Sequence, residues 1–390
     1  MADTEHLPEK LVDLPADAPI QFFDLKAQQT AIRPALEKRW SDILDHGRYI
    51  NGPEVGELEA KLCERTGAAD AVAVGSGTQA LVMPMLALGL GYGDAVFIPG
   101  FTYNATANAI LLAGATPVFV DIDPETFNIC PEDLERRVKQ VAALRHLRAK
   151  AVMPVDLYGL PADYHAIGDV ADRFGLQIIS DAAQSFGGRQ GNKRVGALAQ
   201  ITATSFYPTK TLGAYGDAGA ILTTDKGLGD TMRSIRWHGT GDDRKNSLRV
   251  GLNGRSDSIQ CAVVCEKLSV FDQEGERREL IDTLYRQKLS GEIFCQLAPT
   301  GTVSANGLFT VRVAERERVR SVLSNAGVPT AIYYDTPLHR MPAFEHFAPA
   351  GGLPNCEKAA DEVLSLPMHP YLSEQQVLRV CDELLKAVRR

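Results

Sequence analysis

The amino-acid sequence predicts an α/β fold, in which a mostly parallel sheet is covered by helices. Between residues 70 and 225, short β-branched runs alternate with segments of helical period. This alternation is typical of chains that build one layered α/β domain. After about residue 255 it gives way to a long helical stretch over 256–290 and a final helix over 374–388. We therefore expect a large α/β domain followed by a smaller one.

The expected elements follow from the periodicity, taken in chain order. The predicted strands cover 71–74, 95–98, 117–120, 151–155, 177–180, 201–204 and 219–223. The predicted helices among them cover 78–88, 104–112, 131–147 and 163–174. The expected organisation is an acidic N-terminal extension over 1–20, a large domain over 21–255 and a small C-terminal α/β domain over 256–390.

Composition excludes several functional classes. The 41 Lys and Arg residues against 49 Asp and Glu give a formal net charge of −8, so the overall basic footprint of a nucleic-acid-binding protein is absent. The apolar stretch 105–120 is broken by Asn108, Gly114 and Pro117, so no membrane-spanning helix is expected. The first twenty residues have no apolar core of the kind a secretion signal needs.

The cysteines favour a reducing compartment. Their number is seven, which is odd, and no secretion signal precedes them. We therefore expect free thiols and a cytoplasmic protein. Cys261 and Cys265 are four residues apart on a predicted helix with no histidine near them, which favours a buried helical face over a metal pair. No metal site is predicted.

Ligands of an open α/β sheet bind beyond the carboxyl ends of the strands, so the residues that follow each strand are the candidates. The first strand leads into the sequence GSGTQA at 75–80. There Gly77 and Thr78 open a helix, whose positive end and backbone amides suit a phosphate. A tight strand-to-helix turn explains the glycines equally well.

Three further strands end in chemically useful side chains. Tyr103 follows the second strand and can stack on a planar ligand, or pack as an ordinary aromatic residue. Asp181 follows an apolar strand, where a carboxylate needs a cationic partner, although it also suits a helix N-cap. Ser205 and Lys210 follow the strand 201–204, and a lysine at this edge can attack a carbonyl. Together these residues describe a site for pyridoxal 5'-phosphate, which is a phosphorylated, planar, cationic aldehyde.

Four motifs in this order resemble those of the DegT-like nucleotide-sugar aminotransferases, which are fold-type I enzymes that use pyridoxal phosphate. They are SGTQAL at 76–81, PGFTY at 99–103, DAAQSFG at 181–187 and SFYPTK at 205–210. The resemblance extends from about Phe22 to the C-terminus. It implies a fold-type I aminotransferase architecture and a PLP-dependent transamination.

The resemblance also implies a role for each matching residue. Lys210 would form the Schiff base with the cofactor and then move protons, and Asp181 would pair with the pyridine nitrogen. Gln184 would hydrogen-bond the ring hydroxyl, and Tyr103 would stack on the ring. The phosphate would be held by Gly77, Thr78 and Ser205, and by Asn253 of the neighbouring subunit. A homodimer with shared active sites is therefore expected.

Substrate contacts are expected from three other places. Arg255, in the motif Asn253-Gly254-Arg255, can grip a carboxylate or a diphosphate, although an ion pair across the dimer explains it as well. His238 lies in a loop that borders the substrate in the family, where it would be a catalytic or substrate-binding residue; a surface histidine is the equal alternative. Tyr333 and Tyr334 stand where the family often has a His-Tyr pair, which leaves a different preferred sugar open.

Within the family, the segments 46–55, 249–253 and 365–370 are most similar to the branch acting on UDP-linked 3-keto-2-acetamido glucuronate. That branch uses glutamate as amino donor and serves bacterial surface polysaccharides such as O-antigen. The alternatives are amination of a 4-keto-6-deoxy nucleotide sugar, a PLP-dependent sugar dehydratase, and a regulatory relative without catalysis. Lys210 argues against the dehydratases, in which histidine replaces the lysine. The presence of both Lys210 and Asp181 argues against a non-catalytic protein.

Overall fold

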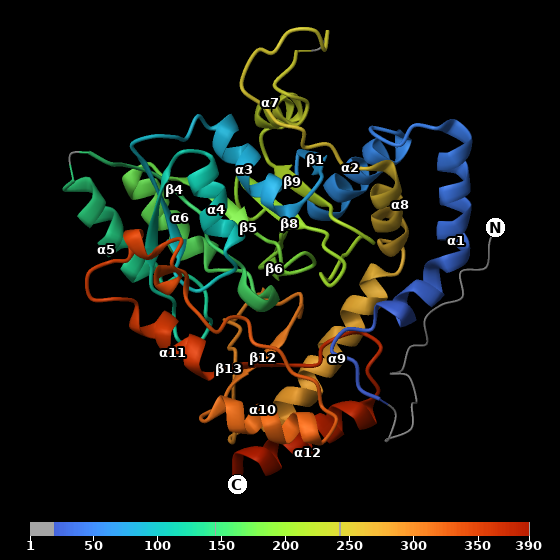
Figure 1. Cartoon of the computed structure of the whole chain (residues 1–390), viewed down its shortest axis with the longest axis vertical. Coiled ribbons are helices and arrows are strands. Elements are labelled where there is room, and N and C mark those ends of the chain that lie inside the picture. The colour runs from blue at the N-terminus through green and yellow to red at the C-terminus, as the bar shows by residue number, and fades with distance from the viewer. Residues whose placement is uncertain (1–18, 145, 242, 390) are drawn as a thin grey trace.

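The computed structural model of the chain describes residues 19–144, 146–241 and 243–389. A seven-stranded sheet forms the centre of this part of the chain (Figure 1). Its strands, in spatial order, are β1 (Asp70–Val74), β9 (Gly219–Thr223), β8 (Ile201–Ser205), β5 (Gln177–Asp181), β4 (Arg148–Val152), β2 (Asp94–Pro99) and β3 (Thr116–Val120). β9 pairs antiparallel with β1 and β8, and the other neighbours in this sheet pair in parallel. The predicted α/β fold with a mostly parallel sheet is confirmed.

Helices cover both faces of this sheet, and side-chain alternation along β2 shows how. Val96 and Ile98 face a core that includes residues of α3 (Gly77–Ala87), α4 (Ala105–Leu112) and α7 (Lys226–Arg236). Ala95 and Phe97 point the other way, into a core with α5 (Pro131–Ala142) and α6 (Tyr164–Phe174). Successive strand residues point to opposite faces, so an apolar strand such as β2 needs a helical layer on each side.

Two predicted boundaries on this side of the sheet are wrong. The helix expected over 131–147 ends at Ala142, and the strand expected over 151–155 is β4, which runs from Arg148 to Val152. Pairing with β2 explains the shift. The Arg148 backbone N–H donates to the Gly93 carbonyl at 2.9 Å, and its guanidinium pairs with Asp94 at 2.8 Å. The chain must therefore be extended by residue 148, which leaves no room for the last helical turn.

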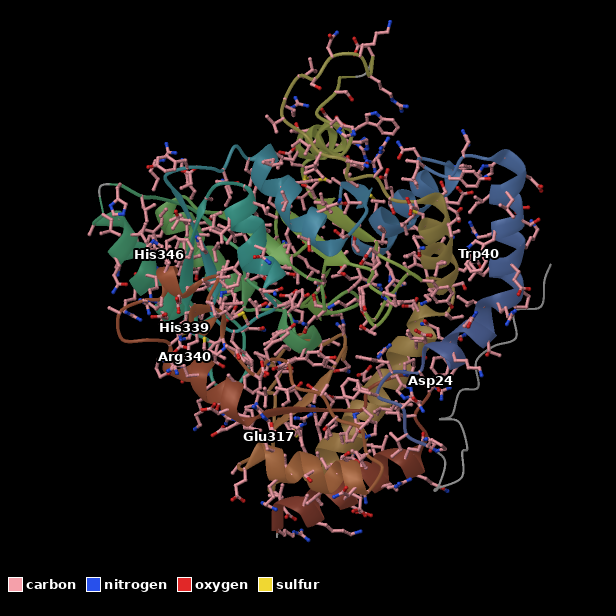
Figure 2. All side chains as sticks on the ribbon, viewed as in Figure 1. Asp24, Trp40, Glu317, His339, Arg340 and His346 are labelled. Atoms are coloured by element: carbon pink, nitrogen blue, oxygen red, sulfur yellow. The ribbon has the colours of Figure 1, made fainter. Side chains whose placement is uncertain are left out.

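The helical stretch expected over 256–290 is two helices, α8 (Ser258–Lys267) and α9 (Phe271–Leu289). The stretch is interrupted because its two halves pack against different helices. α8 packs against α1 (Leu25–His46) and α2 (Pro53–Thr66), whereas α9 packs against α12 (Glu374–Arg389). The Asp24 side chain begins α1 by accepting the Ala27 N–H at 2.9 Å (Figure 2). Cys261 and Cys265 are buried on α8, as the interpretation of a core face predicts.

A second, antiparallel sheet lies below the first in Figure 1. It joins β10 (Phe294–Cys295), β12 (Phe309–Arg312) and β13 (Val363–Leu366), and α9, α10 (Arg316–Asn325), α11 (Pro354–Glu362) and α12 lie around it. A small ribbon of β6 (Arg189–Gln190), β7 (Lys193–Arg194) and β11 (Thr302–Val303) joins the two parts of the chain. Ile20 packs into the core of the second sheet. The domain boundary at residue 255 stays a prediction.

Short 3-10 turns complete the fold at η1 (Leu157–Gly159), η2 (Leu338–Arg340) and η3 (Glu345–Phe347). Among the described residues, no helix is both long and apolar enough to cross a membrane.

Candidate active site

A cavity of about 460 Å³ lies at the carboxyl ends of β1, β2, β5 and β8. The predicted site residues that line it are Gly77, Thr78, Tyr103, Asp181, Gln184, Ser205, Lys210, Tyr333 and Tyr334. Parallel strands that end at the same edge explain why the residues from Gly77 to Lys210 meet here. Tyr333 and Tyr334 come from the C-terminal part of the chain, next to Ala331, which forms a bridge with β13.

The first wall of the cavity is the beginning of α3. Ser76 is its N-cap, and its hydroxyl accepts the Gln79 N–H at 3.2 Å. Gly77 lies so close to Ser205 that a Cβ added at position 77 would come within 2.7 Å of the Ser205 Cβ. A side chain at this position would therefore force the two segments apart. The close approach leaves the free N–H groups of the first helical turn beside the Ser205 hydroxyl, an arrangement that suits an anion.

The opposite wall is the end of β5, where Asp181 is only 4% exposed. One carboxylate oxygen accepts the Thr106 hydroxyl at 2.9 Å, and the other accepts the Ala183 N–H at 3.2 Å. Burial raises the pKa of Asp181, while these two hydrogen bonds and the charge of Lys210 oppose the rise. A cationic group in the cavity would favour the ionised carboxylate further.

Lys210 follows β8, and its backbone N–H donates to the Tyr207 carbonyl at 2.9 Å. Burial lowers the pKa of its amine, and the nearby Asp181 carboxylate partly offsets the change. A lysine with a lowered pKa is neutral in a larger fraction of molecules at neutral pH. Only the neutral amine can attack a carbonyl carbon, so this environment prepares Lys210 for nucleophilic chemistry.

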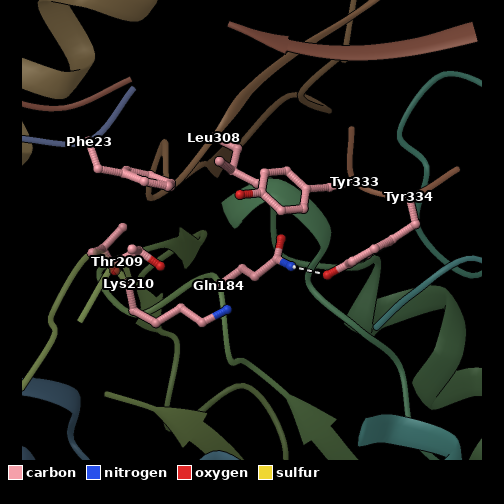
Figure 3. Close-up of a pocket in the computed structure, with 9 residues that line it drawn as sticks. Phe23, Gln184, Thr209, Lys210, Leu308, Tyr333 and Tyr334 are labelled. Carbon is pink, nitrogen blue, oxygen red and sulfur yellow. Dashed lines mark hydrogen bonds between the residues drawn. The ribbon is translucent and has the colours of Figure 1, made fainter. Parts of the chain in front are cut away.

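Gln184 and Tyr334 lie above the lysine (Figure 3). The Gln184 side-chain carbonyl accepts the Tyr158 N–H at 2.7 Å, and its amide nitrogen donates to the Tyr334 hydroxyl at 3.2 Å. The Tyr103 ring lies 6.0 Å from the Tyr334 ring, between centroids, and is 56% exposed. Two phenol rings and an amide thus border the space between Asp181 and Lys210.

A smaller cavity of about 70 Å³ lies on the other side of Lys210 and Gln184. Phe23, from the segment that precedes α1, forms part of its wall together with Tyr333 and Leu308 (Figure 3). Tyr333 is further held by its backbone carbonyl, which accepts the Tyr158 hydroxyl. The N-terminal segment therefore reaches the site, which the sequence did not suggest.

Three predicted residues do not line either cavity. His238 and Asn253 are exposed, and the Arg255 guanidinium lies 4.7 Å from the Trp237 ring. The Arg255 Nε donates to the Asn253 side-chain oxygen at 2.9 Å. His238 belongs to the segment that projects after α7 (Figure 1). Asn253 and Arg255 lie where this segment returns to the large sheet: the Gln79 amide donates to the Asn253 carbonyl at 3.1 Å, and Arg255 forms an isolated β-bridge with Val74. Their predicted functions depend on a neighbouring subunit and stay predictions.

Sequence reasoning missed Thr106, Tyr158 and Phe23. Thr106 holds Asp181 from α4, and Tyr158 holds both Gln184 and Tyr333 from η1. No motif marks these positions. Thr106 lies only three residues after the PGFTY motif, on the helix that follows, which is the one signal that could have found it.

The chain matches the DegT/DnrJ/EryC1/StrS aminotransferase family over residues 31–385. It belongs to this family. It is 42% identical to the UDP-2-acetamido-2-deoxy-3-oxo-D-glucuronate aminotransferase of Pseudomonas aeruginosa over 369 residues, which cover 94% of this chain and 99% of that one. It is 37% identical to the pleiotropic regulatory protein of Geobacillus stearothermophilus, over 95% of this chain and 99% of that one.

A solved DegT-family aminotransferase from Brucella abortus has the same fold. It superposes with a TM-score of 0.93 at 42% sequence identity, over 95% of this chain and 100% of that one. Fold-type I architecture is thereby confirmed. The chain is a DegT-family aminotransferase, and pyridoxal 5'-phosphate is the cofactor of such enzymes.

The residues of this chain fit that cofactor. The contact between Gly77 and Ser205 places the first turn of α3 beside the Ser205 hydroxyl, where its N–H groups suit a phosphate, and the buried Asp181 carboxylate is available to a ring nitrogen. Lys210 lies in the same cavity and presents the amine. When bound, pyridoxal phosphate supplies an electron-withdrawing ring that accepts the electron pair left at an amino-bearing carbon.

Proposed function

We propose that this DegT-family aminotransferase converts a keto group of a nucleotide-linked sugar into an amine, with a UDP-linked 3-keto-2-acetamido sugar or uronate as substrate and glutamate as donor. The observation that carries the proposal is the joint position of Lys210, Asp181 and Tyr334 on one cavity. The substrate class is supported by the Pseudomonas relative and by a UDP-N-acetyl-3-dehydro-α-D-glucosamine aminotransferase of Acidithiobacillus ferrooxidans, 35% identical over 95% of this chain.

Lys210 is proposed to do two tasks in turn. Its lowered pKa makes the amine available to hold the cofactor covalently. When not bonded to the cofactor, the same amine would lie free in the cavity, where it could take a proton from the amino-bearing carbon and return one to the neighbouring position. A single base serves both transfers because neither requires the lysine to leave the site.

Asp181 is proposed to keep the ring nitrogen protonated. Thr106 and the Ala183 N–H hold its carboxylate in one orientation. A protonated nitrogen makes the ring a stronger electron acceptor, which is the reason a buried carboxylate is useful here.

The remaining contacts orient the ring and the phosphate. Gln184 uses one amide hydrogen on Tyr334 and its carbonyl on Tyr158, which leaves a second amide hydrogen for the ring hydroxyl. Tyr103 would cover the ring face. Gly77, Thr78 and Ser205 would bind the phosphate through helix N–H groups and hydroxyls.

We further propose a homodimer, in which the segment 238–255 of one subunit supplies Asn253, Arg255 and His238 to the other subunit's site. The exposure of Asn253 and His238 supports this arrangement, and so does the position of all three residues away from the cavity lining of their own chain. Arg255 would meet the carboxylate or diphosphate of the sugar nucleotide, and Tyr333 and Tyr334 would contact the sugar. The seven free thiols favour a cytoplasmic enzyme, serving the synthesis of a surface polysaccharide such as O-antigen.

A panel of sugar nucleotides tests the proposal. The enzyme is loaded with pyridoxamine phosphate and incubated with UDP- and dTDP-linked 3-keto and 4-keto sugars, and the products are identified by mass spectrometry. We expect amination of the UDP-linked 3-keto-2-acetamido sugars. Amination of the 4-keto sugars alone would replace the substrate, and loss of water without amination would indicate a dehydratase. No turnover of any sugar, despite bound cofactor, would favour the regulatory alternative.

A further inference from the structure

A second cluster of buried charges lies at the junction of α8 and α9, and none of its members lines either cavity. Lys267, Glu274 and Arg277 are 1%, 1% and 3% exposed, and Arg278 and Tyr371 are each 8% exposed. The cluster therefore holds three basic side chains against one carboxylate. Glu274, Arg277 and Arg278 are neighbours on one helix because they are three and four residues apart.

The carboxylate of this cluster is already occupied by neutral donors. Glu274 accepts the Gln28 amide through both oxygens, at 2.8 and 2.9 Å. One of the same oxygens accepts the Tyr371 hydroxyl at 2.7 Å. Glu274 lowers the local potential but makes no hydrogen bond with a basic side chain among the described residues.

The basic side chains lack hydrogen-bond partners. All three nitrogens of the Arg277 guanidinium are buried without a hydrogen bond to any described residue, and so is the Lys267 amine. The Lys267 amine faces an aromatic ring, that of Tyr215, at 4.3 Å. Arg278 makes one long hydrogen bond, of 3.5 Å, to the Met368 carbonyl.

Deprotonation of the basic side chains does not remove the excess of positive charge in the cluster. Burial lowers the pKa of Lys267 to about 8, so this amine can become neutral near physiological pH. Burial, followed by the charge of Arg278, lowers the pKa of the adjacent His369 to about 4, so His369 stays neutral and adds no charge. A guanidinium, however, does not deprotonate in proteins. Arg277, which lies 6.0 Å from the Tyr371 ring, therefore keeps a full, buried charge; Glu274 acts on it through space, but no described carboxylate hydrogen-bonds it.

We propose that this cluster is an anion site, in which the planar fork of Arg277 binds a carboxylate or a phosphate group, with Lys267 beside it. An isolated buried charge costs several kcal/mol unless it is paired, and a guanidinium pairs best with a planar or tetrahedral oxyanion through two parallel hydrogen bonds. The site is separate from the cavity that holds Lys210, so the inference does not rest on the proposed function.

The sequence offers one source of carboxylates. Residues 1–18 lie outside the described residues, but their sequence contains Asp3, Glu5, Glu9, Asp13 and Asp17 against one lysine. The first described residues contact the chain on either side of Tyr371: the Pro19 carbonyl accepts the Gln376 amide at 3.2 Å, and the Gln21 carbonyl lies 3.1 Å from the His369 Nε2. A free anion such as inorganic phosphate is the second source of the same chemistry.

If residues 1–18 supply the anion, the occupied site would anchor the chain before Phe23, which borders the smaller cavity beside Lys210. The anion would thus help to hold one wall of the active site in place from a distance.

The direction in which Arg277→Met changes the Tm tests whether an anion pairs with Arg277. Arg277→Met keeps most of the side-chain volume and removes the charge. If an anion pairs with Arg277, the variant loses that pair, and the Tm of the full-length protein should fall by about 3 °C or more. If the charge is unpaired, its removal should leave the Tm unchanged or raise it. Arg320→Met on α10, where the arginine is 40% exposed and pairs with Glu317, is the matched control and should shift the Tm by less than about 1 °C.

Two arms identify the source of the anion. In phosphate-free buffer, the five acids of residues 1–18 are replaced by their amides; if they supply the carboxylate, Arg277→Met no longer lowers the Tm in this background. If phosphate is the ligand, added inorganic phosphate raises the Tm of the wild type but not that of Arg277→Met. An unchanged or raised Tm for Arg277→Met in both buffers overturns the proposal. An equal fall in the amide background without phosphate overturns it too, because that fall reports packing alone.

Crosslinking gives a second readout that does not depend on stability. In an Arg277→Lys variant, carbodiimide should join the new amine to a carboxylate of residues 1–18, and inorganic phosphate should compete with this reaction. The absence of any such crosslink, together with no phosphate-dependent rise in Tm, would also overturn the proposal.

Discussion

Lys210 and Lys267 are two lysines whose pKa values burial lowers, and each has one carboxylate nearby. Beside Lys210, the Asp181 carboxylate offsets the effect of burial on the amine, and both of its oxygens are hydrogen-bonded, while Asp217 also lines the cavity. Around Lys267 the basic groups are in excess, and the Arg277 fork has no described hydrogen-bond partner. The first region also encloses a cavity of about 460 Å³. The Lys210–Asp181 pair lies beside a cavity, which suits chemistry on a bound molecule. The excess of buried positive charge around Lys267 instead requires a counter-ion.

The largest expected effect comes from substituting the two lysines, because only Lys210 is assigned a catalytic role. Lys210→Ala removes both the covalent anchor and the base, so the rate of amination should fall on the order of 10⁴-fold or more. Lys267→Met, the matched control, should reduce the rate by less than about tenfold, because Lys267 does not line the cavity. Product formation is followed by mass spectrometry, and retained cofactor by absorbance after gel filtration. Comparable rates for the two variants would contradict the assignment of Lys210.

The second largest effect is expected from substituting the carboxylates Asp181 and Glu274. Asp181→Asn keeps the shape of the side chain but removes the charge that would keep the ring nitrogen protonated. We expect the single-turnover rate of amino transfer to fall on the order of 10²- to 10³-fold, with cofactor still bound. Absorbance during one half-reaction is the measurement. Glu274→Gln, in the other cluster, should leave this rate within about tenfold and lower the Tm instead. An undiminished rate in Asp181→Asn would remove the role given to this residue.

The smallest expected effect comes from removing a hydrogen bond beside Lys210, so that a buried charged group there lacks a partner, as Arg277 does near Lys267. Thr106→Val leaves one oxygen of Asp181 without its hydroxyl donor. That hydrogen bond lowers the pKa of Asp181, so its loss should raise the pKa further. Activity that needs the ionised carboxylate should then begin to fail at a higher pH, so the acidic limb of the pH–rate profile should move to higher pH. Thr106→Ser, which keeps a hydroxyl, should restore the profile. A shift to lower pH would contradict this account.

Much of the fold follows from local patterns. All seven predicted strands of the large sheet are present, because apolar β-branched runs between helical segments leave few alternatives. The errors fall where distant pairing decides the boundary. β4 begins at Arg148 because β2 pairs with it there, and the helical stretch over 256–290 breaks because its halves pack against different layers.

In the candidate active site, too, some residues were predictable from local sequence and others were not. Residues next to strand ends, such as Thr78, Asp181 and Lys210, were predictable because the topology of a parallel sheet brings strand ends together. Thr106 and Tyr158 were not, because their use depends on the direction in which α4 and η1 present each side chain to β5 and to Gln184.

By itself, the sequence determined the α/β class, the family and the residues able to carry the chemistry, since periodicity and short motifs are local properties of the chain. Only the tertiary structure decided which polar groups are satisfied. It showed Asp181 held by two donors, and it left Arg277 buried without a hydrogen-bond partner among the described residues. The physical reason is that burial and hydrogen bonding depend on segments distant in sequence, so the same residue types form a balanced site in one place and an unpaired charge in another.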